Sequence, residues 1–344
     1  MELSEYLPKS ALVVKTTEIN QPRFPVIDMH NHLGEMFGGG WDQRPLSELL
    51  DVLDRSSVRR LVDLDGGWGE DILNRHLDKF KQAAPERFLV YGGVDWSAWQ
   101  EQGDHFGEWA AKQLRQQVRR GAQGLKIWKP LGLSVRDHHQ ELVGVDDPRL
   151  DPIWQTAGEM NIPITIHVGD PVAFFLPLNG SNERYEELVH HTDWQFPSPP
   201  FPPLETVLNG LWKMVKRNSR TTFIAAHVGC YAENLAWVGA FLEDCPNLYV
   251  DIAARVPELG RQPYSSRRFF LKYADRIVFG MDLPANPDSY RIYYRFLESD
   301  DEYFDYDISA PPPQGRWRIY GIFLPDEVLE KVYHGNAEKI LGKA

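Results

Sequence analysis

Short apolar runs recur along the chain, and each is followed by a segment in which apolar residues repeat with helical spacing. The runs have the length of β-strands and span residues 25–32, 59–65, 88–95, 124–129, 163–169, 222–229, 248–254 and 277–282. The helical segments span residues 45–57, 71–84, 106–120, 150–160, 204–216, 233–243, 265–274 and 326–341. Eight strand–helix units predict an α/β fold, a (β/α)₈ TIM barrel. A doubly wound open sheet would carry a glycine-rich phosphate loop after its first strand, and no such motif occurs.

Two connections are much longer than the others, at residues 171–203 after the fifth strand and 284–325 after the eighth. Both contain many aromatic residues, which argues against a solvated, disordered insertion. Both also follow the carboxyl ends of strands, where barrel enzymes build their active sites. We therefore expect ordered lids or subunit contacts within a barrel domain of residues 25–344, preceded by a leader of residues 1–24.

Composition narrows the classes of function. Hydrophobic residues at 42% and charged residues at 25% are ordinary for a globular protein. The net charge of −12 argues against nucleic acid or an anionic membrane as a partner, because both require a basic surface. Cys230 and Cys245 are the two cysteines, so the sequence has no disulfide framework. The acidic, proline-containing start does not resemble a signal peptide, and we expect a cytoplasmic protein.

The first predicted strand carries Asp28, His30 and His32 at alternating positions. Successive side chains of a strand point to opposite faces, so these three are expected to share one face. Neutral imidazole is a standard ligand of zinc and related divalent ions. Two histidines at this spacing therefore predict a metal site whose other ligands come from elsewhere in the chain.

Three other predicted strands end in residues suited to the same chemistry. His167 ends the fifth run on the face opposite Ile164 and Ile166, His227 lies near the end of the sixth, and Asp282 ends the eighth. Each alone would more often be a structural residue. Their joint occurrence at the carboxyl ends of strands predicts metal binding or acid–base chemistry at the mouth of the barrel.

Two cations are also expected to face the barrel. Lys126 could carry a bridging carbamate, bind an anionic substrate group or pair with Asp95. Arg255 could clamp a carboxylate or pair with Asp251. We predict that Lys126 and Arg255, together with Trp128, bind substrate.

The motifs as a set resemble the amidohydrolase superfamily, specifically its amidohydrolase-2 branch, which includes aminocarboxymuconate-semialdehyde decarboxylase-like enzymes and lactone hydrolases. The resemblance covers about residues 26–341 and is carried by Asp28-x-His30-x-His32, His167, His227-x-Gly229, Gly280-x-Asp282 and the closing segment 333–341. It implies that His30, His32, His167 and Asp282 bind a single divalent metal ion, for which zinc is expected. It further implies that His227, together with Asp282, performs the acid–base chemistry. A second metal ion would require that Lys126 be carbamylated.

These observations predict a metal-dependent hydrolase that cleaves a C–O or C–N bond, as in a lactone or amide, of a small carboxylate-bearing molecule. A nonoxidative decarboxylase of an aromatic or unsaturated carboxylate is the alternative. A noncatalytic binding barrel is disfavoured because metal-competent residues occupy the strand ends. The aromatic lids predict a homodimer. The remaining histidines are expected in surface or loop positions, some within reach of substrate: His76, His105, His138, His139, His190, His191 and His334.

Overall fold

The structure is a computed structural model that describes residues 5–37 and 39–342, so the outer ends of the predicted leader and barrel domain lie outside the described residues. Its strands form two parallel ladders, in the orders β1-β2-β3 and β4-β5-β6-β7-β8. The strands are β1 (Val26–Asn31), β2 (Val58–Asp63), β3 (Phe88–Val90), β4 (Leu125–Ile127), β5 (Ile164–Ile166), β6 (Phe223–Ala225), β7 (Leu248–Asp251) and β8 (Ile277–Val278).

Backbone hydrogen bonds join the two ladders at both seams. Between β3 and β4, the Gly92 N–H donates to Gly124 O (2.9 Å) and the Lys126 N–H donates to Gly92 O (2.8 Å). Between β1 and β8, the Met29 N–H donates to Phe279 O (2.9 Å) and the Asp282 N–H donates to His30 O (2.8 Å). The eight strands therefore form a closed ring, as the alternation of strands and helices predicted.

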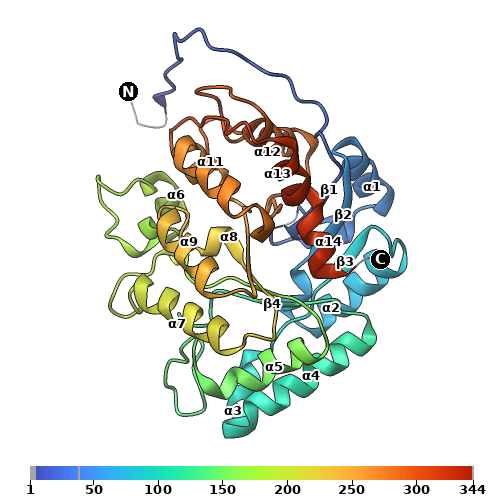
Figure 1. The fold of residues 1–344 in the computed structure, drawn as a ribbon. Coiled ribbons are helices and arrows are strands. Elements are labelled where there is room, and N and C mark those ends of the chain that lie inside the picture. The colour runs from blue at the N-terminus through green and yellow to red at the C-terminus, as the bar shows by residue number, and fades with distance from the viewer. Residues whose placement is uncertain (1–4, 38, 343–344) are drawn as a thin grey trace.

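Helices cover the outside of the ring (Figure 1). They are α1 (Leu46–Arg55), α2 (Glu70–His76), α3 (Trp99–Gln102), α4 (Phe106–Arg120), α5 (Asp151–Glu159), α6 (Tyr185–His190), α7 (Leu204–Arg217), α9 (Leu235–Asp244), α10 (Val256–Gly260), α11 (Pro263–Lys272), α12 (Pro287–Glu298), α13 (Asp326–Glu330) and α14 (Asn336–Leu341). Two π-helical segments, Leu77–Gln82 and Lys331–Gly335, continue α2 and α13. Short 3₁₀ turns lie at Trp41–Gln43, Asp65–Trp68, Trp96–Ala98, Gly103–His105, Pro148–Leu150, Val172–Phe175, Thr192–Trp194 and Ala274–Arg276.

Two apolar layers hold the barrel together. Alternate strand residues such as Ile27, Val62, Leu89 and Ile224 form the cluster inside the ring. Residues of the opposite parity form the outer cluster under the helices, and these include Ile164 and Ile166, as predicted for the fifth strand. A helix such as α7 contributes to the outer layer because its buried residues recur every three or four positions.

Both long insertions are ordered and pack into the protein's own core. Residues 171–203 contain α6, and residues 284–325 contain α12, whose buried face includes Tyr290 and Tyr294. Phe174 and Phe196 of the first insertion and Phe304 of the second are buried. Their aromatic composition thus reflects packing within the chain.

The N-terminal segment runs along the outside of the molecule as an extended chain (Figure 1). Thr17 fastens it, since its N–H and its hydroxyl both donate to the carboxylate of Asp301, at 2.6 and 2.7 Å. None of the helices among the described residues is long and apolar enough to cross a membrane.

Candidate metal centre

The neighbouring strands β1 and β8 bring His30, His32 and Asp282 together at the carboxyl ends of the strands. The Nε2 atom of His32 lies 3.0 Å from Oδ1 of Asp282, and Nε2 of His30 lies 3.7 Å from the same oxygen. One ligand atom from each of the three lies within 4.8 Å of the others. Both histidines are buried, and the Asp282 side chain is 21% exposed. The predicted pair of histidines therefore converges on one carboxylate.

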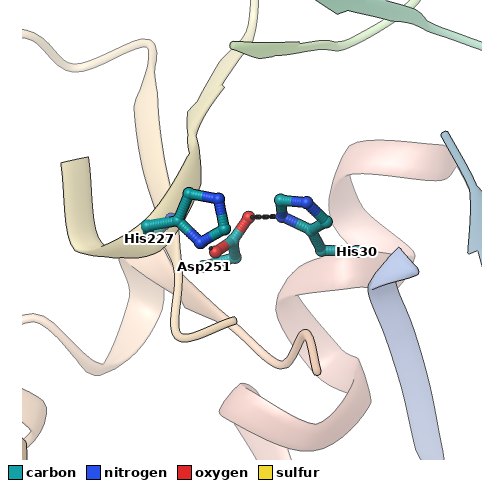
Figure 2. Close-up of side chains that lie close together, drawn as sticks. All are labelled: His30, His227 and Asp251. Carbon is teal, nitrogen blue, oxygen red and sulfur yellow. Dashed lines mark hydrogen bonds and ion pairs between the residues drawn. The ribbon is translucent and has the colours of Figure 1, made fainter. Parts of the chain in front are cut away.

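Buried carboxylates fix the orientation of both imidazole rings. Nδ1 of His30 lies 2.8 Å from Oδ2 of Asp251, and Nδ1 of His32 lies 2.8 Å from Oδ1 of Asp65. Figure 2 shows Asp251 between His30 and His227. Because a carboxylate accepts, each Nδ1 carries a proton, and each Nε2 is directed at Asp282. This tautomer is the one that a metal-binding histidine requires.

Asp28 does not share the face of His30, which corrects the expectation for the first strand. Its carboxylate accepts from the Tyr290 hydroxyl of α12 (2.7 Å) and from the Asn31 amide (2.8 Å), on the helix-facing side. The pairing of β1 with β2 shifts register between Asp28 and Asn31, and this irregularity breaks the strict alternation of side chains. Burial raises the pKa of Asp28 to about 6.

His227 lies on a turn directly after β6, in the four-residue segment α8 (Ala226–Gly229). Its Nδ1 donates to Ala253 O (2.8 Å), and its backbone N–H donates to Oδ1 of Asp251 (2.8 Å). The lone pair of Nε2 therefore faces Oδ2 of Asp282 at 3.6 Å. Burial lowers the pKa of His227 well below its ordinary value, so the ring is neutral and able to accept a proton.

Left-handed backbone conformations gather around this centre. The φ angles are 59° at His227, 57° at Val228, 52° at Ala254 and 53° at Asp282. Side chains other than glycine rarely adopt such angles, and surrounding hydrogen bonds must hold them. The Ala254 N–H donates to Met281 O (3.1 Å), for example. The strained turns point the side chains of His227 and Asp282 at one another.

His167 lies beside His227, with 4.4 Å between the ring centroids. Its Nε2 is buried and has no hydrogen-bond partner among the described residues, although Oδ1 of Asp170 lies 3.4 Å away. Asp170 is also paired with Lys129 at 2.7 Å. Burial lowers the pKa of His167. A buried, neutral imidazole nitrogen without a partner fits an additional ligand for a metal ion.

The charges of the centre also fit a bound cation. Burial opposes the imidazolium form of His32, but hydrogen bonds to Asp282 and Asp65 outweigh it and raise its pKa to about 9. Burial would raise the pKa of Asp282, but interactions with His30 and His32 hold it well below its ordinary value. Asp65 and Asp282 thus stabilise one positive charge on His32. A metal ion bound there would neutralise the same two carboxylates.

Lys126 projects into the barrel, opposite Leu125 and Ile127, as predicted. Its Nζ lies 3.4 Å from Nε2 of His30. Among the described residues no carboxylate oxygen lies within 4.0 Å of it, so the alternative of a pair with Asp95 is wrong; Asp95 instead accepts from the Ser97 N–H. Burial lowers the pKa of Lys126 to about 8.

Arg255 follows β7 and is 5% exposed. Its guanidinium donates to Ala254 O (2.9 Å), and within residues 5–37 and 39–342 it forms no ion pair. The alternative pair with Asp251 is therefore also wrong, because Asp251 is engaged by His30 and His227. A buried guanidinium without a counter-ion is suited to an anionic ligand.

An aromatic wall stands next to the centre. Trp128 stacks on His32 at 5.1 Å and on Trp68 at 3.9 Å between ring centroids. Behind this wall lies a cavity of about 810 Å³ whose lining includes Trp68, Trp96, Trp109 and Trp128. Trp128 therefore borders both the centre and an aromatic cavity, and its indole N–H is buried without a partner among the described residues.

A network of buried side chains that the sequence did not reveal supports His32. Asp65, which accepts from His32, is held in place by Asp63, whose Oδ1 accepts from the Asp65 N–H (3.2 Å). Nδ1 of His76 lies 2.5 Å from Oδ2 of Asp63, and His76 is fully buried, so its predicted surface or loop position is wrong. The spacing Asp63-x-Asp65 at the end of an apolar run was the available signal.

The sequence of the chain matches the model of a known protein family. The family model described as amidohydrolase matches residues 27–343. No curated protein sequence matches the chain.

Solved structures share the fold at low sequence identity. A 2,6-dihydroxybenzoate decarboxylase from Rhizobium is 14% identical, with a TM-score of 0.56 over 92% of this chain and 98% of that one. A dihydroxybenzoic acid decarboxylase from Polaromonas, with bound manganese and the inhibitor 2-nitroresorcinol, is 15% identical, with a TM-score of 0.54 over 92% of this chain and 96% of that one. A probable 2-pyrone-4,6-dicarboxylic acid hydrolase from Acinetobacter baumannii is 11% identical, with a TM-score of 0.51 over 93% of this chain and all of that one.

Proposed function

This chain belongs to the amidohydrolase family, and from that premise we propose that it is a metal-dependent hydrolase of a C–O or C–N bond in a small, carboxylate-bearing substrate. The observation that carries the proposal is the position of Asp282, whose two oxygens lie 3.0 Å from Nε2 of His32 and 3.6 Å from Nε2 of His227. One carboxylate thus links a metal-competent histidine to a neutral, unprotonated base.

The residues that would hold one divalent ion, which we propose to be zinc, are His30, His32, His167 and Asp282. The inward Nε2 atoms of His30 and His32 and the unpartnered Nε2 of His167 support this set. When bound, such an ion lowers the pKa of a coordinated water and polarises a substrate oxygen. Carbamylation of Lys126 would be needed for a second ion, and the lowered pKa of Lys126 leaves it partly neutral and able to react.

His227 is proposed to move the proton in hydrolysis. Its Nε2 accepts a proton from the attacking water, while the Nδ1 bond to Ala253 O keeps the ring in the tautomer that can do so. The carboxylate of Asp282 stabilises the resulting imidazolium, and His227 then returns the proton to the leaving group.

Three residues are proposed to bind the substrate. Arg255 and Lys126 are buried cations without a carboxylate partner in the part of the chain that the structure describes, and they would attract the substrate carboxylate. Trp128 would form an apolar wall for the remainder of the molecule and could donate its free indole N–H.

Nonoxidative decarboxylation of an aromatic carboxylate is the second candidate. The stack of Trp68 on Trp128 beside His32, with an aromatic cavity of about 810 Å³ behind it, favours a planar substrate. Two of the structural neighbours bear the names of dihydroxybenzoate decarboxylases. In this reaction His227 and Asp282 would together deliver the proton to the ring carbon.

Parallel assays on one metal-loaded preparation test the proposal. Metal content is measured by mass spectrometry, acid release is followed with lactones, amides and esters, and carbon dioxide release is followed with hydroxylated aromatic carboxylates. Stoichiometric metal with acid release supports the hydrolase, and carbon dioxide release alone replaces it with the decarboxylase. Protein that binds no divalent ion after chelator-free preparation overturns both.

A further inference from the structure

A second hollow lies at the opposite end of the barrel from the candidate metal centre. It has a volume of about 1170 Å³ and lies at the amino-terminal ends of four strands. Its lining includes Pro25, Ser57 and Arg87, directly before β1, β2 and β3, and Gln123, two residues before β4. Arg60 and Asp63 are three residues apart on β2, which corresponds to about 10 Å along a strand. The hollow is therefore separate from the catalytic face.

Four cations line this hollow in a protein whose net charge is −12. Arg59 is paired with Glu338, and Arg87 is paired with Asp54 at 2.8 Å. Arg60 and Lys81 have no carboxylate oxygen within 4.0 Å among residues 5–37 and 39–342. Lys81 donates only to Pro85 O (3.0 Å). Arg60 and Lys81 thus form no ion pair in the described part of the chain, although Glu338 and Glu86 interact with them at longer range.

Two side chains that line the hollow, Arg60 and Gln123, carry uncompensated polar atoms, and so does Tyr91, which interacts with Arg60. Nε of Arg60, Oε1 of Gln123 and the hydroxyl of Tyr91 are all buried and have no hydrogen-bond partner in the described part of the chain. Tyr91 is fully buried, and its ring reaches down over Gly124, where a Cβ atom would lie 2.4 Å from the ring. Buried polar groups of this kind cost stability unless something binds them.

Electrostatic coupling agrees with this geometry. Burial lowers the pKa of Arg60, and the charge of Arg59 lowers it further. Burial also lowers the pKa of Lys81, and Arg60 adds to that shift. An anion between these cations would remove the repulsion.

We propose that this hollow is a binding site for the phosphate group of a small organic molecule. The planar guanidinium of Arg60 and the ammonium of Lys81 match the two negative charges of a phosphate. Asp54, Glu86 and Glu338 also line the hollow, so binding of an anion would depend on Arg60 and Lys81.

Calorimetric titration of the metal-loaded protein with inorganic phosphate and with pyrophosphate tests the site. We expect saturable binding that is about tenfold or more weaker in Lys81→Met and in Arg60→Met, because each removes a charge-assisted contact. Lys213→Met is the matched control. Lys213 is 69% exposed and does not line the hollow, so this change should have little effect on the affinity for phosphate. Phosphate should also raise the melting temperature of the wild type and of Lys213→Met.

Two outcomes overturn the proposal. One is absence of saturable phosphate binding by the wild type, which would leave the hollow to water. The other is binding that Lys81→Met and Arg60→Met do not weaken, which would locate the anion at the metal centre or elsewhere. Lys81 lies at the surface, so Lys81→Met keeps the test decisive even where Arg60→Met fails to fold.

Discussion

At the scale of single residues, the partner behind each imidazole ring determines what its free nitrogen can do. Asp251 and Asp65 hold His30 and His32 with Nε2 toward Asp282, whereas a backbone carbonyl holds His227 in the same tautomer without adding negative charge. An imidazole whose Nδ1–H donates to a carboxylate is the better metal ligand, whereas an imidazole whose Nδ1–H donates to a carbonyl is a weaker base. This difference separates the proposed ligands from the proposed acid–base group.

Substitution of His227 and His167 should have different effects. We expect His227→Asn to keep nearly stoichiometric metal and to lose about 10²- to 10⁴-fold in turnover, as for removal of an acid–base group. His167→Asn should lose metal as well as activity. Metal content, turnover and melting temperature are measured on both variants. Equal metal loss in the two would make His227 a ligand, and a lower melting temperature with normal turnover per folded molecule would make it structural.

The carboxylate behind His32 should govern metal affinity. Asp65→Asn keeps the shape of the side chain but removes the charge that orients and polarises His32, so we expect affinity for zinc to fall about 10- to 100-fold. Competition with a chromophoric chelator measures the dissociation constant. Asp78→Asn, an exposed change nearby, serves as the control. Unchanged affinity in Asp65→Asn would contradict the role of this network.

The sequence could place the residues at the strand ends but not the contacts between them. His30, His32 and Asp282 were predictable because each closes an apolar run, and ends of parallel strands meet at one face. The face of the strand on which Asp28 lies was not predictable, because a register shift does not change the hydrophobic pattern of the sequence. The burial of His76 was not either, because its partner Asp63 belongs to another element.

At the scale of elements, the periodic segments agreed with the structure within a few residues. The clearest omission is α12 within the insertion 284–325. Its buried face consists largely of tyrosines, among them Tyr290, Tyr293 and Tyr294, so a pattern of aliphatic residues was absent. The π-helical segment Leu77–Gln82 fell inside the expected helix 71–84, because a single π turn within a helix is too short to change the apolar pattern.

The anchor of the N-terminal segment should depend on pH. Burial would raise the pKa of Asp301, but hydrogen bonds from Thr17 and the charge of Arg295 outweigh it and lower the pKa below 3.8. A lowered carboxyl pKa stabilises the fold above the unfolded value, and this contribution is lost as pH falls through the folded value. Asp301→Asn should therefore reduce the free energy of unfolding at pH 7 by about 1–3 kcal/mol.

Urea denaturation at several pH values checks this expectation. The difference in unfolding free energy between wild type and Asp301→Asn should narrow as pH falls below about 4, where the carboxylate of the unfolded state takes up a proton before that of the folded state. A gap of the same size at pH 7 and pH 3 would show that the charge of Asp301 is not what holds the segment.

At the scale of the whole molecule, the homodimer remains a prediction. The aromatic residues that suggested it are mostly buried within the chain, but Leu176, Tyr185 and Val189 of the first insertion are 51%, 41% and 38% exposed. We expect light scattering to give twice the 39.6 kDa of one chain, and Tyr185→Asp to give the single mass. Tyr264→Asp, at a residue 80% exposed on α11, should leave the dimer intact. A single-chain mass for the wild type would refute the prediction.

The residues with left-handed backbone conformations around the centre also indicate which positions could change when the protein is selected for higher thermal stability. An alanine at φ 52° costs about 1 kcal/mol that a glycine would not. Ala254 offers no side-chain chemistry, so glycine there would relieve conformational strain with little effect on turnover. His227 and Asp282 bear the same strain, but their side chains are the proposed reactive groups. Laboratory evolution at rising temperature should therefore change position 254 and leave 227 and 282 unaltered, which would distinguish strain that serves the reaction from strain that only accompanies it.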